Sequence, residues 1–295
     1  MTSSDDAVRD RILGLAWGLW AEAGLSGWAD RRRDVAIDIE ALIHFTAAVG
    51  EHDPRLRDES TDWCVQFGGL VSKVRLKTIA KVGIGTAERF GEYAATVNAH
   101  SGLTWPTGPA TARVVVPSRR SSLDLTRASL IQLRARAIFG VAARAEILST
   151  MAIDPAATYT GSQLAERTRF GRRMTVEAAD LLVRSGLLAS PGDSPARTFG
   201  LGRGSEIRAL LAPVPSRSRA WPSAFRVLWV IWLISEERRP RTVAVRAVEA
   251  RKLLAGLDRH AALAGLPLPP QLDASVAAWT DYERWVSATV ERVGS

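Results

Sequence analysis

The sequence has almost no sulfur or imidazole chemistry. It holds one cysteine, Cys64, and four histidines among 295 residues. A single cysteine excludes an internal disulfide and a cluster of thiolate metal ligands. His44 and His52 lie near Asp53, but they lack the i, i+4 spacing by which two histidines on one helix hold zinc. We therefore expect no metal and no cofactor, and we interpret Cys64 as a core residue.

Long hydrophobic runs and an export leader are also missing. The longest apolar run, residues 225–234, is about half of the roughly 20 residues that a membrane-spanning helix needs, and Arg226 interrupts it. The N-terminal MTSSDDAVRD is polar and acidic, unlike the basic and then apolar start of a secretory signal. We expect a soluble, cytoplasmic protein with no membrane partner.

The common motifs of catalytic and nucleotide-binding sites do not occur. The segment GIGTAERFG, residues 83–91, follows no alternating apolar strand and has no acidic residue placed for a ribose, so it is not a dinucleotide fingerprint. The segment GLGRGS, residues 200–205, lacks the lysine of a phosphate-binding loop. No nucleophile elbow is present. We predict that the protein is not an enzyme, and we name no catalytic residue.

Lysine is scarce, with 4 residues against 35 arginines. Lys73, Lys77 and Lys81 share one face of a predicted helix, which we interpret as solvated, with a second DNA-contacting surface as the alternative. The net charge of +8 is concentrated: residues 113–220 hold 17 Arg and 8 Asp or Glu (+9), against 22 Lys or Arg and 23 Asp or Glu elsewhere (−1). Cationic contacts to phosphates release bound counterions, so this segment suits a polyanionic partner.

Apolar residues recur at helical spacing along most of the chain. The predicted helices outside the winged-helix pattern described below are 6–23, 39–49, 56–67, 71–82, 86–99, 123–139, 225–235, 243–264 and 274–293. Stretches rich in proline, serine and arginine at 100–122 and 213–222 mark the boundaries. We therefore predict an N-terminal helical region (1–112), a central domain (123–212) and a C-terminal helical region (223–295). Several of the ten tryptophans, Trp17, Trp20, Trp63 and Trp229, are interpreted as core, with an aromatic effector pocket as the alternative.

Residues 136–201 have the order of a winged helix-turn-helix. A helix at 141–151 precedes a strand edge at Tyr159, and Thr160 has capping-box spacing to Gln163 at the start of a second helix. Phe170 would fill the turn and Gly171 would let the chain reverse. A third helix, 172–185, is followed by wing strands at 187–190 and 197–201 around PGDSPA. The predicted fold is mainly α with one small β-wing.

The third helix is the candidate recognition helix, because its N-terminal end enters the major groove in this motif. Guanidinium groups there pair with guanine or grip phosphates. The candidate DNA-binding residues comprise that helix end, one residue of the second helix, the turn and the wing: Ser162, Arg169, Arg172, Arg173, Val176, Glu177 and Arg197. The helix carries few amide or hydroxyl groups beyond its two arginines, so base-specific readout is expected to be limited.

The segments FGVAARAEIL, TGSQLAERTRFGRRMTVEAADLLVRSGLL and RTFGL resemble the MarR/ArsR-type winged-helix regulators of bacteria. The segments EALIHFTAAVGEHDPRLRDESTDWCVQFGGLVSKVRL and FGEYAATVNAHSG are similar to those of a group of roughly 300-residue bacterial proteins built around such a module. The resemblance implies a transcriptional regulator that binds double-stranded DNA. It also implies a homodimer, for which the apolar helix at 225–234 is the candidate interface, with burial inside its own domain as the alternative.

Other functions stay open at this point. A degenerate winged helix can hold another protein, as in an antitoxin-like or defence-associated interaction module. An enzyme hidden in the flanking helices has the least support, since no acid/base cluster is visible.

Overall fold

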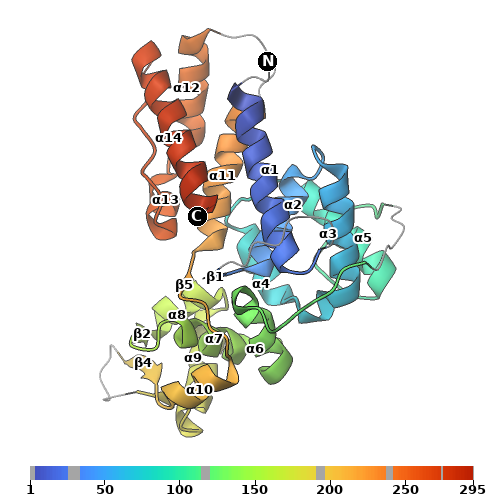
Figure 1. The fold of residues 1–295 in the computed structure, drawn as a ribbon, viewed down its shortest axis with the longest axis vertical. Coiled ribbons are helices and arrows are strands. Elements are labelled where there is room, and N and C mark those ends of the chain that lie inside the picture. Colours follow the sequence, from blue (N-terminus) through green and yellow to red (C-terminus); the bar gives the residue numbers. More distant parts are fainter. Residues whose placement is uncertain are drawn as a thin grey trace.

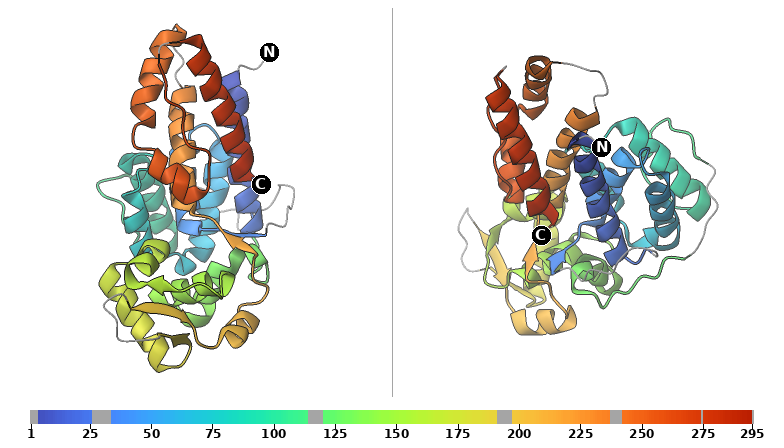
Figure 2. Two further views of the ribbon diagram at one scale, coloured as in Figure 1. Left: turned by 90° about the vertical axis from the view of Figure 1, so that its left-hand side faces the viewer. Right: turned by 45° about the horizontal axis from the view of Figure 1, so that its top comes forward.

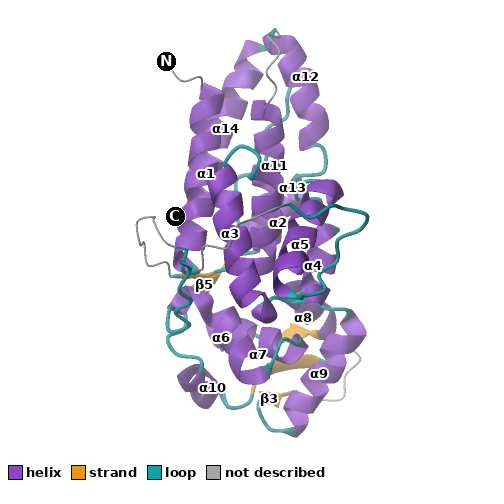
Figure 3. Ribbon diagram, turned by 90° about the vertical axis from the view of Figure 1, so that its right-hand side faces the viewer, coloured by secondary structure: helices purple, strands orange, loops and turns teal. Residues whose placement is uncertain are grey.

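The computed structural model describes residues 4–25, 34–113, 120–190, 197–236, 242–273 and 275–294. The fold is mainly helical, as predicted, and its few strands are short (Figures 1 and 3). The buried apolar side chains form two clusters. The larger cluster combines residues from the beginning and the end of the chain with Leu130 and Leu133, and the smaller one is formed by residues between 131 and 211.

The larger cluster is built by helices from both ends of the chain, which we call the helical body. Its N-terminal elements are α1 (Ser4–Glu22), α2 (Ile39–Val49), α3 (Pro54–Phe67), η1 (Gly68–Leu70), α4 (Lys73–Ala80) and α5 (Ala87–Ser101). Its C-terminal elements are α11 (Trp221–Glu236), α12 (Val243–Leu254), α13 (Asp258–Ala264) and α14 (Val276–Gly294). Helix α11 packs against α1 and α2, so the two ends of the chain lie side by side (Figure 2).

Side-chain caps set the starts of the body helices. Asp38, Asp53, Ser72 and Thr86 each accept a hydrogen bond from a backbone N–H in the first turn of α2, α3, α4 and α5. Each cap satisfies one of the backbone donors that a helix start leaves unpaired. In α3 the cap is followed by Pro54, whose fixed φ suits the first helical position.

Aromatic side chains fill the centre of the helical body. Phe45 of α2 stacks on Phe225 of α11 with ring centroids 4.5 Å apart, and Trp20 meets Trp63 edge-on at 5.3 Å. The four tryptophans predicted to be core, Trp20 and Trp63 among them, are all buried. Cys64 is also buried, as predicted. Helix α11 is buried along almost its whole length inside the body, so the prediction that it offers a dimer interface is wrong.

The smaller cluster belongs to a unit formed by the middle of the chain, which we call the α6–α10 unit. Its elements are η2 (Ala128–Leu130), α6 (Ile131–Phe139), α7 (Ala143–Ile153), β2 (Tyr159–Thr160), α8 (Gly161–Thr168), α9 (Arg172–Arg184), β3 (Leu188–Ala189), β4 (Thr198–Leu201) and α10 (Gly204–Leu210). The three strands form an antiparallel sheet in the order β2-β4-β3. In register, Tyr159 faces Phe199 and Leu188 faces Leu201. The predicted loop PGDSPA, residues 191–196, lies outside the described residues.

Short extended segments connect the two parts. Strand β1 (Val35–Ala36) pairs in parallel with β5 (Arg217–Ser218), so the segment that enters α2 lies beside the segment that enters α11. The α6–α10 unit therefore lies at one end of the helical body, below β5 in Figure 1.

Two predicted helices are wrong in extent. The predicted helix 123–139 contains helix only from η2 onward, because the Asp124 carboxylate accepts hydrogen bonds from Thr126 and holds a turn there. The predicted helix 243–264 is two helices, α12 and α13, separated at Gly256 with φ 77°. Glycine adopts this left-handed conformation without a steric penalty, and the second helix can then change direction.

Candidate nucleic-acid interface

The turn between α8 and α9 positions the candidate site. The predicted capping box is present: the Thr160 side chain accepts from the Gln163 N–H, and the Gln163 side chain accepts from the Thr160 N–H at 2.8 Å. The two helices pack closely at Gly161, where an added Cβ would lie 2.6 Å from Val176 Cγ2. Phe170 is buried in the turn, as predicted.

The chain reversal does not use the glycine that was predicted for it. Gly171 has φ −60°, which any residue adopts, and it is the N-cap of α9. The left-handed position is Arg169, with φ 60°, the only non-glycine residue with positive φ in the described part of the chain. The left-handed backbone conformation is unfavourable for arginine, so the surrounding packing has to stabilise it.

The N-terminal end of α9 is exposed and basic. Arg172 and Arg173 occupy its first turn, and the side chain of Arg173 is 92% exposed. No side chain caps this helix, so the backbone N–H groups of its first turn keep their capacity to bind an anion. Arg173 forms an i, i+4 ion pair with Glu177 at 2.8 Å. An exposed pair of this kind is weak because water screens the two charges, so it opens readily for another partner.

The other predicted residues differ in exposure and in their place relative to α9. Ser162 is exposed on the first turn of α8. Val176 is half-buried against Gly161 and is therefore partly a packing residue. Arg197, at the start of β4, pairs with Asp180 of α9 at 2.6 Å and donates to Ser190 Oγ at 2.7 Å. These contacts join the β-hairpin to the exposed side of α9.

Arg169 is placed apart from the other predicted residues. Its side chain is half-buried and lines a cavity at the junction between the α6–α10 unit and the helical body. Burial lowers its pKa, while Asp38 of the body raises it. In this conformation Arg169 therefore faces the helical body, and a contact with DNA stays a prediction.

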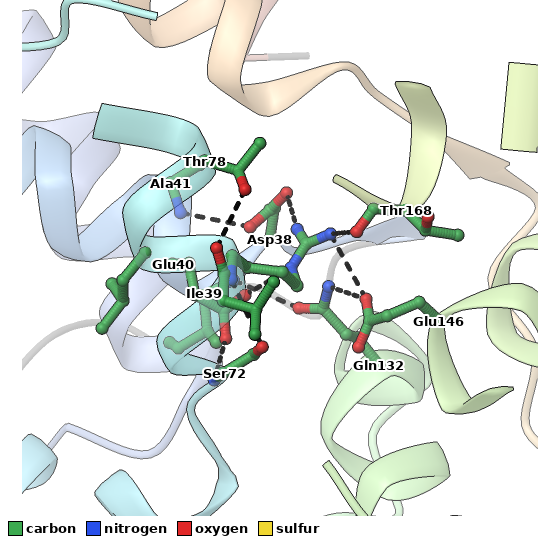
Figure 4. Close-up of polar contacts among 12 residues, drawn as sticks. Asp38, Ile39, Glu40, Ala41, Ser72, Thr78, Gln132, Glu146 and Thr168 are labelled. Carbon is green, nitrogen blue, oxygen red and sulfur yellow. Dashed lines mark hydrogen bonds and ion pairs between the residues drawn. The ribbon is translucent and has the colours of Figure 1, made fainter. Parts of the chain in front are cut away.

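Sequence reasoning missed a buried ionic cluster at the same junction, which we call the junction network (Figure 4). Its charged members are Asp38 and Glu40 of the α2 start, Arg75 of α4, Arg136 of α6 and Glu146 of α7. Glu40 is central, because both guanidinium groups bind it: Arg75 Nε lies 2.8 Å from Oε2, and Arg136 Nη1 lies 2.5 Å from Oε1. Arg136 also pairs with Glu146 at 2.6 Å.

Neutral groups complete the junction network across the two cores. Ser72 N–H donates to Glu40 at 2.7 Å, and Gln132 joins both sides by donating to Glu146 and accepting from the Ile39 N–H. Arg75 donates to the Thr168 carbonyl at the end of α8. Burial alone would raise the pKa of Glu40, but Arg136 and Arg75 outweigh it and lower this pKa to about 2. Glu40 is therefore ionised at neutral pH.

The remaining titratable candidates belong to the core. Burial lowers the pKa of His44 to about 4, and its ring stacks on Phe90 and bonds the Leu76 carbonyl. Burial also raises the pKa of the Cys64 thiol, whose Sγ lies 3.5 Å from Tyr93 Oη. Among the described residues, no group of three or more His, Cys, Asp or Glu side chains is placed to hold a metal ion. No helix within the described ranges has both the length and the apolar character to cross a bilayer.

Comparison with known proteins gives no matching protein family, no matching curated protein and no matching solved structure. The functional argument therefore depends on the chemistry and geometry of this chain.

Proposed function

We propose that the protein binds double-stranded DNA and regulates transcription, and that the part of the α6–α10 unit from α7 to β4 is a winged helix-turn-helix. The observation that carries the proposal is the order of elements: helix, short strand, two helices joined by a tight turn, and a hairpin beside the last helix. In a winged helix-turn-helix this order presents the second helix of the pair to the major groove. Here that helix is α9.

The chemistry of α9 supports the same partner. Arg172 has no ion-pair partner among the described residues, and the uncapped first turn adds backbone donors directed at an incoming phosphate. Arg173 reaches DNA once its exposed pair with Glu177 opens. Arg197 of the hairpin would contact an adjacent stretch of DNA backbone once its ion pair with Asp180 opens. Phosphate contacts of this kind give affinity and register, whereas base-edge contacts give sequence preference.

A titration of fluorescent duplex DNA with the full-length protein tests the proposal. We expect Arg172→Ala with Arg173→Ala to weaken binding about ten-fold or more, and to lower the slope of log K against log salt by about 0.9 for each phosphate that these arginines neutralise. Arg251→Ala with Lys252→Ala is the matched control, since both side chains are exposed on α12 and the charge change is identical. Equal weakening in the two double variants would reject α9 as the interface. If the unchanged protein did not bind duplex DNA at low salt, the proposed function would be rejected.

A protein-interaction module is the second candidate, of the antitoxin-like or defence-associated kind. It is favoured by two apolar side chains on α9, because Leu181 is 63% exposed and Met174 is 43% exposed. Exposed apolar side chains on one helix suit a protein partner better than phosphates. On this alternative, the unchanged protein would capture a stoichiometric protein partner and would show no salt-dependent affinity for DNA. Leu181→Ser would then abolish the capture of that partner.

A further inference from the structure

A cavity of about 580 Å³ lies between the helical body and the α6–α10 unit. Its walls come from the start of α2, from α7, from β2 and α8, and from the segment that enters α11. These elements surround the junction that Figures 1 and 4 show between the two cores. The cavity is distinct from the exposed end of α9, because neither Arg172 nor Arg173 lines it.

The charges lining the cavity do not cancel. Four arginines line it, Arg75, Arg167, Arg169 and Arg219, together with three carboxylates, Asp38, Glu146 and Glu166. Glu166 is neutralised from outside the cavity by Arg259 at 3.3 Å. The lining side chains therefore carry more positive than negative charge.

Two of these arginines, Arg167 and Arg169, are the candidate anion ligands. Arg75 is saturated by Asp38, Glu40 and Glu146. Arg167 and Arg169 have no carboxylate within ion-pair distance in the described parts of the chain. Arg167 Cζ lies over the Tyr159 ring, 4.7 Å from its centroid. Arg169 is held in its left-handed conformation at the end of α8, half-buried against the body.

An unpaired, half-buried guanidinium is unfavourable unless an anion reaches it, since burial penalises the charged form. Arg169 is such a group, and the exposed Arg167 beside it supplies a second guanidinium, so the two together match a dianion better than a monoanion. A phosphate monoester carries a charge of about −1.5 to −2 at neutral pH, and its oxygens accept the paired donors of guanidinium groups. A carboxylate would leave one positive charge uncompensated.

The rest of the cavity suits an organic group. Its volume is well above that of a phosphate alone, and Tyr159 and Trp221 line it together with Ile131, Ile153 and Leu263. Ligand sites commonly combine such apolar and aromatic walls with a few polar groups that fix orientation. Duplex DNA is far too wide to enter a space of this size.

We propose that this cavity binds a small organic phosphate, with the phosphoryl group held by Arg167 and Arg169 and the organic part against Tyr159 and Trp221. The inference does not depend on DNA binding, because its site and its readout are both separate from α9. It places a small-molecule site at the contact between the two cores.

Isothermal titration of the full-length protein, without DNA, tests this proposal with AMP and glucose 6-phosphate as probes. Adenosine and glucose are the matched compounds without the phosphoryl group, and benzoate is the monoanion. We expect at least one phosphate ester to bind at least about ten-fold more tightly than its uncharged counterpart and than benzoate. Binding of neither ester at millimolar concentration, or equal binding of ester and counterpart, would overturn the proposal.

Arginine variants locate the binding. Arg169→Asn removes the guanidinium and keeps a residue type that tolerates the left-handed conformation, so the turn is retained. We expect it to weaken the ester about ten-fold or more. Arg167→Ala, at an exposed side chain, is the second variant and should do the same. Arg184→Ala is the control, because Arg184 is exposed at the end of α9 and does not line the cavity. Unchanged ester affinity in folded Arg169→Asn and Arg167→Ala would refute the assignment.

Discussion

Replacing Glu40 with glutamine tests the junction network directly. Glu40 is completely buried and accepts four hydrogen bonds, one from the Ser72 N–H, one from Arg75 and two from Arg136. Glutamine has the same shape but no charge, and its NH₂ group would be turned toward donors. The change leaves two buried guanidinium groups with one fewer carboxylate between them.

The pKa of Glu40 sets the size of the effect. A pKa of about 2, against a usual 4.5, corresponds to about 3 kcal/mol of preference for the ionised form in the folded protein. Breaking a buried ion pair from one side costs about 3–5 kcal/mol in other proteins, because the remaining charge is left uncompensated. We therefore expect Glu40→Gln to lower the free energy of unfolding by about 3 kcal/mol or more.

Urea unfolding followed by tryptophan fluorescence measures this change, since Trp20 and Trp63 are buried in the same core as Glu40. Glu291→Gln is the control: Glu291 is exposed on α14, and its change should stay within about 0.5 kcal/mol. The unchanged protein should also lose stability as the pH falls from 4.5 toward 2, because the depressed pKa stabilises only the ionised form, and Glu40→Gln should lose less over this range. If Glu40→Gln lowered the free energy of unfolding by less than about 1 kcal/mol at neutral pH, the charge of Glu40 would not be needed for stability.

Two further predictions concern the cores. His44 has a folded-state pKa of about 4, below its usual 6.5, so its contribution to stability is complete above pH 6.5 and is lost as the pH falls toward 4. A His44→Gln variant should therefore show a smaller change of unfolding free energy with pH between these values. The same pH dependence in the variant and the unchanged protein would contradict this. Gly161→Ala should destabilise the protein by about 1–3 kcal/mol, because its Cβ would meet Val176 Cγ2 at 2.6 Å. Val176→Ala in the same chain should restore part of this stability. Thermal unfolding of the single and double variants measures both effects, and additive effects would exclude this contact as the cause.

The parts of the fold that the sequence predicts are those set by neighbouring residues. The capping box from Thr160 to Gln163 is a contact across three residues, and it is present as expected. Gly186 after α9 has φ 73°, a left-handed conformation that glycine adopts easily, and this too is a local effect. Helix α9 itself begins at Arg172 and ends at Arg184, one residue short of the predicted end. Local chemistry of this kind does not depend on how distant segments pack.

Charge counted along the sequence is a poorer guide to charge on the surface. The basic excess in residues 113–220 includes Arg136, which is buried in the junction network, and Arg134, which donates to the backbone carbonyls of Leu125 and Pro213. Arg208 likewise donates to the Ala152 carbonyl. These arginines compensate buried acceptors, so they add little to the attraction for a polyanion. The net basic character of the α9 end depends mainly on Arg172 and Arg173.

The junction network itself could not be predicted, because its members are far apart in the sequence. Glu40 is followed by the apolar residues of α2, and Arg136 lies 96 positions further along the chain. A charged residue within an apolar helix face is the one available signal, since charge is rarely buried without a partner. That signal marks Glu40 as needing a cation but does not identify which of 35 arginines supplies it.

The contact between the two cores differs chemically from the cores themselves. Each core is apolar, whereas the junction holds the ionic network, the two-residue pairing of β1 with β5 and a cavity lined by arginines. Ion pairs and hydrogen bonds require particular distances and angles, so they fix the position of one core relative to the other more narrowly than apolar contact does. Arg75 binds both the network and the Thr168 carbonyl one residue before Arg169. The orientation of α8, and of α9 after the turn, therefore follows the charges at the junction.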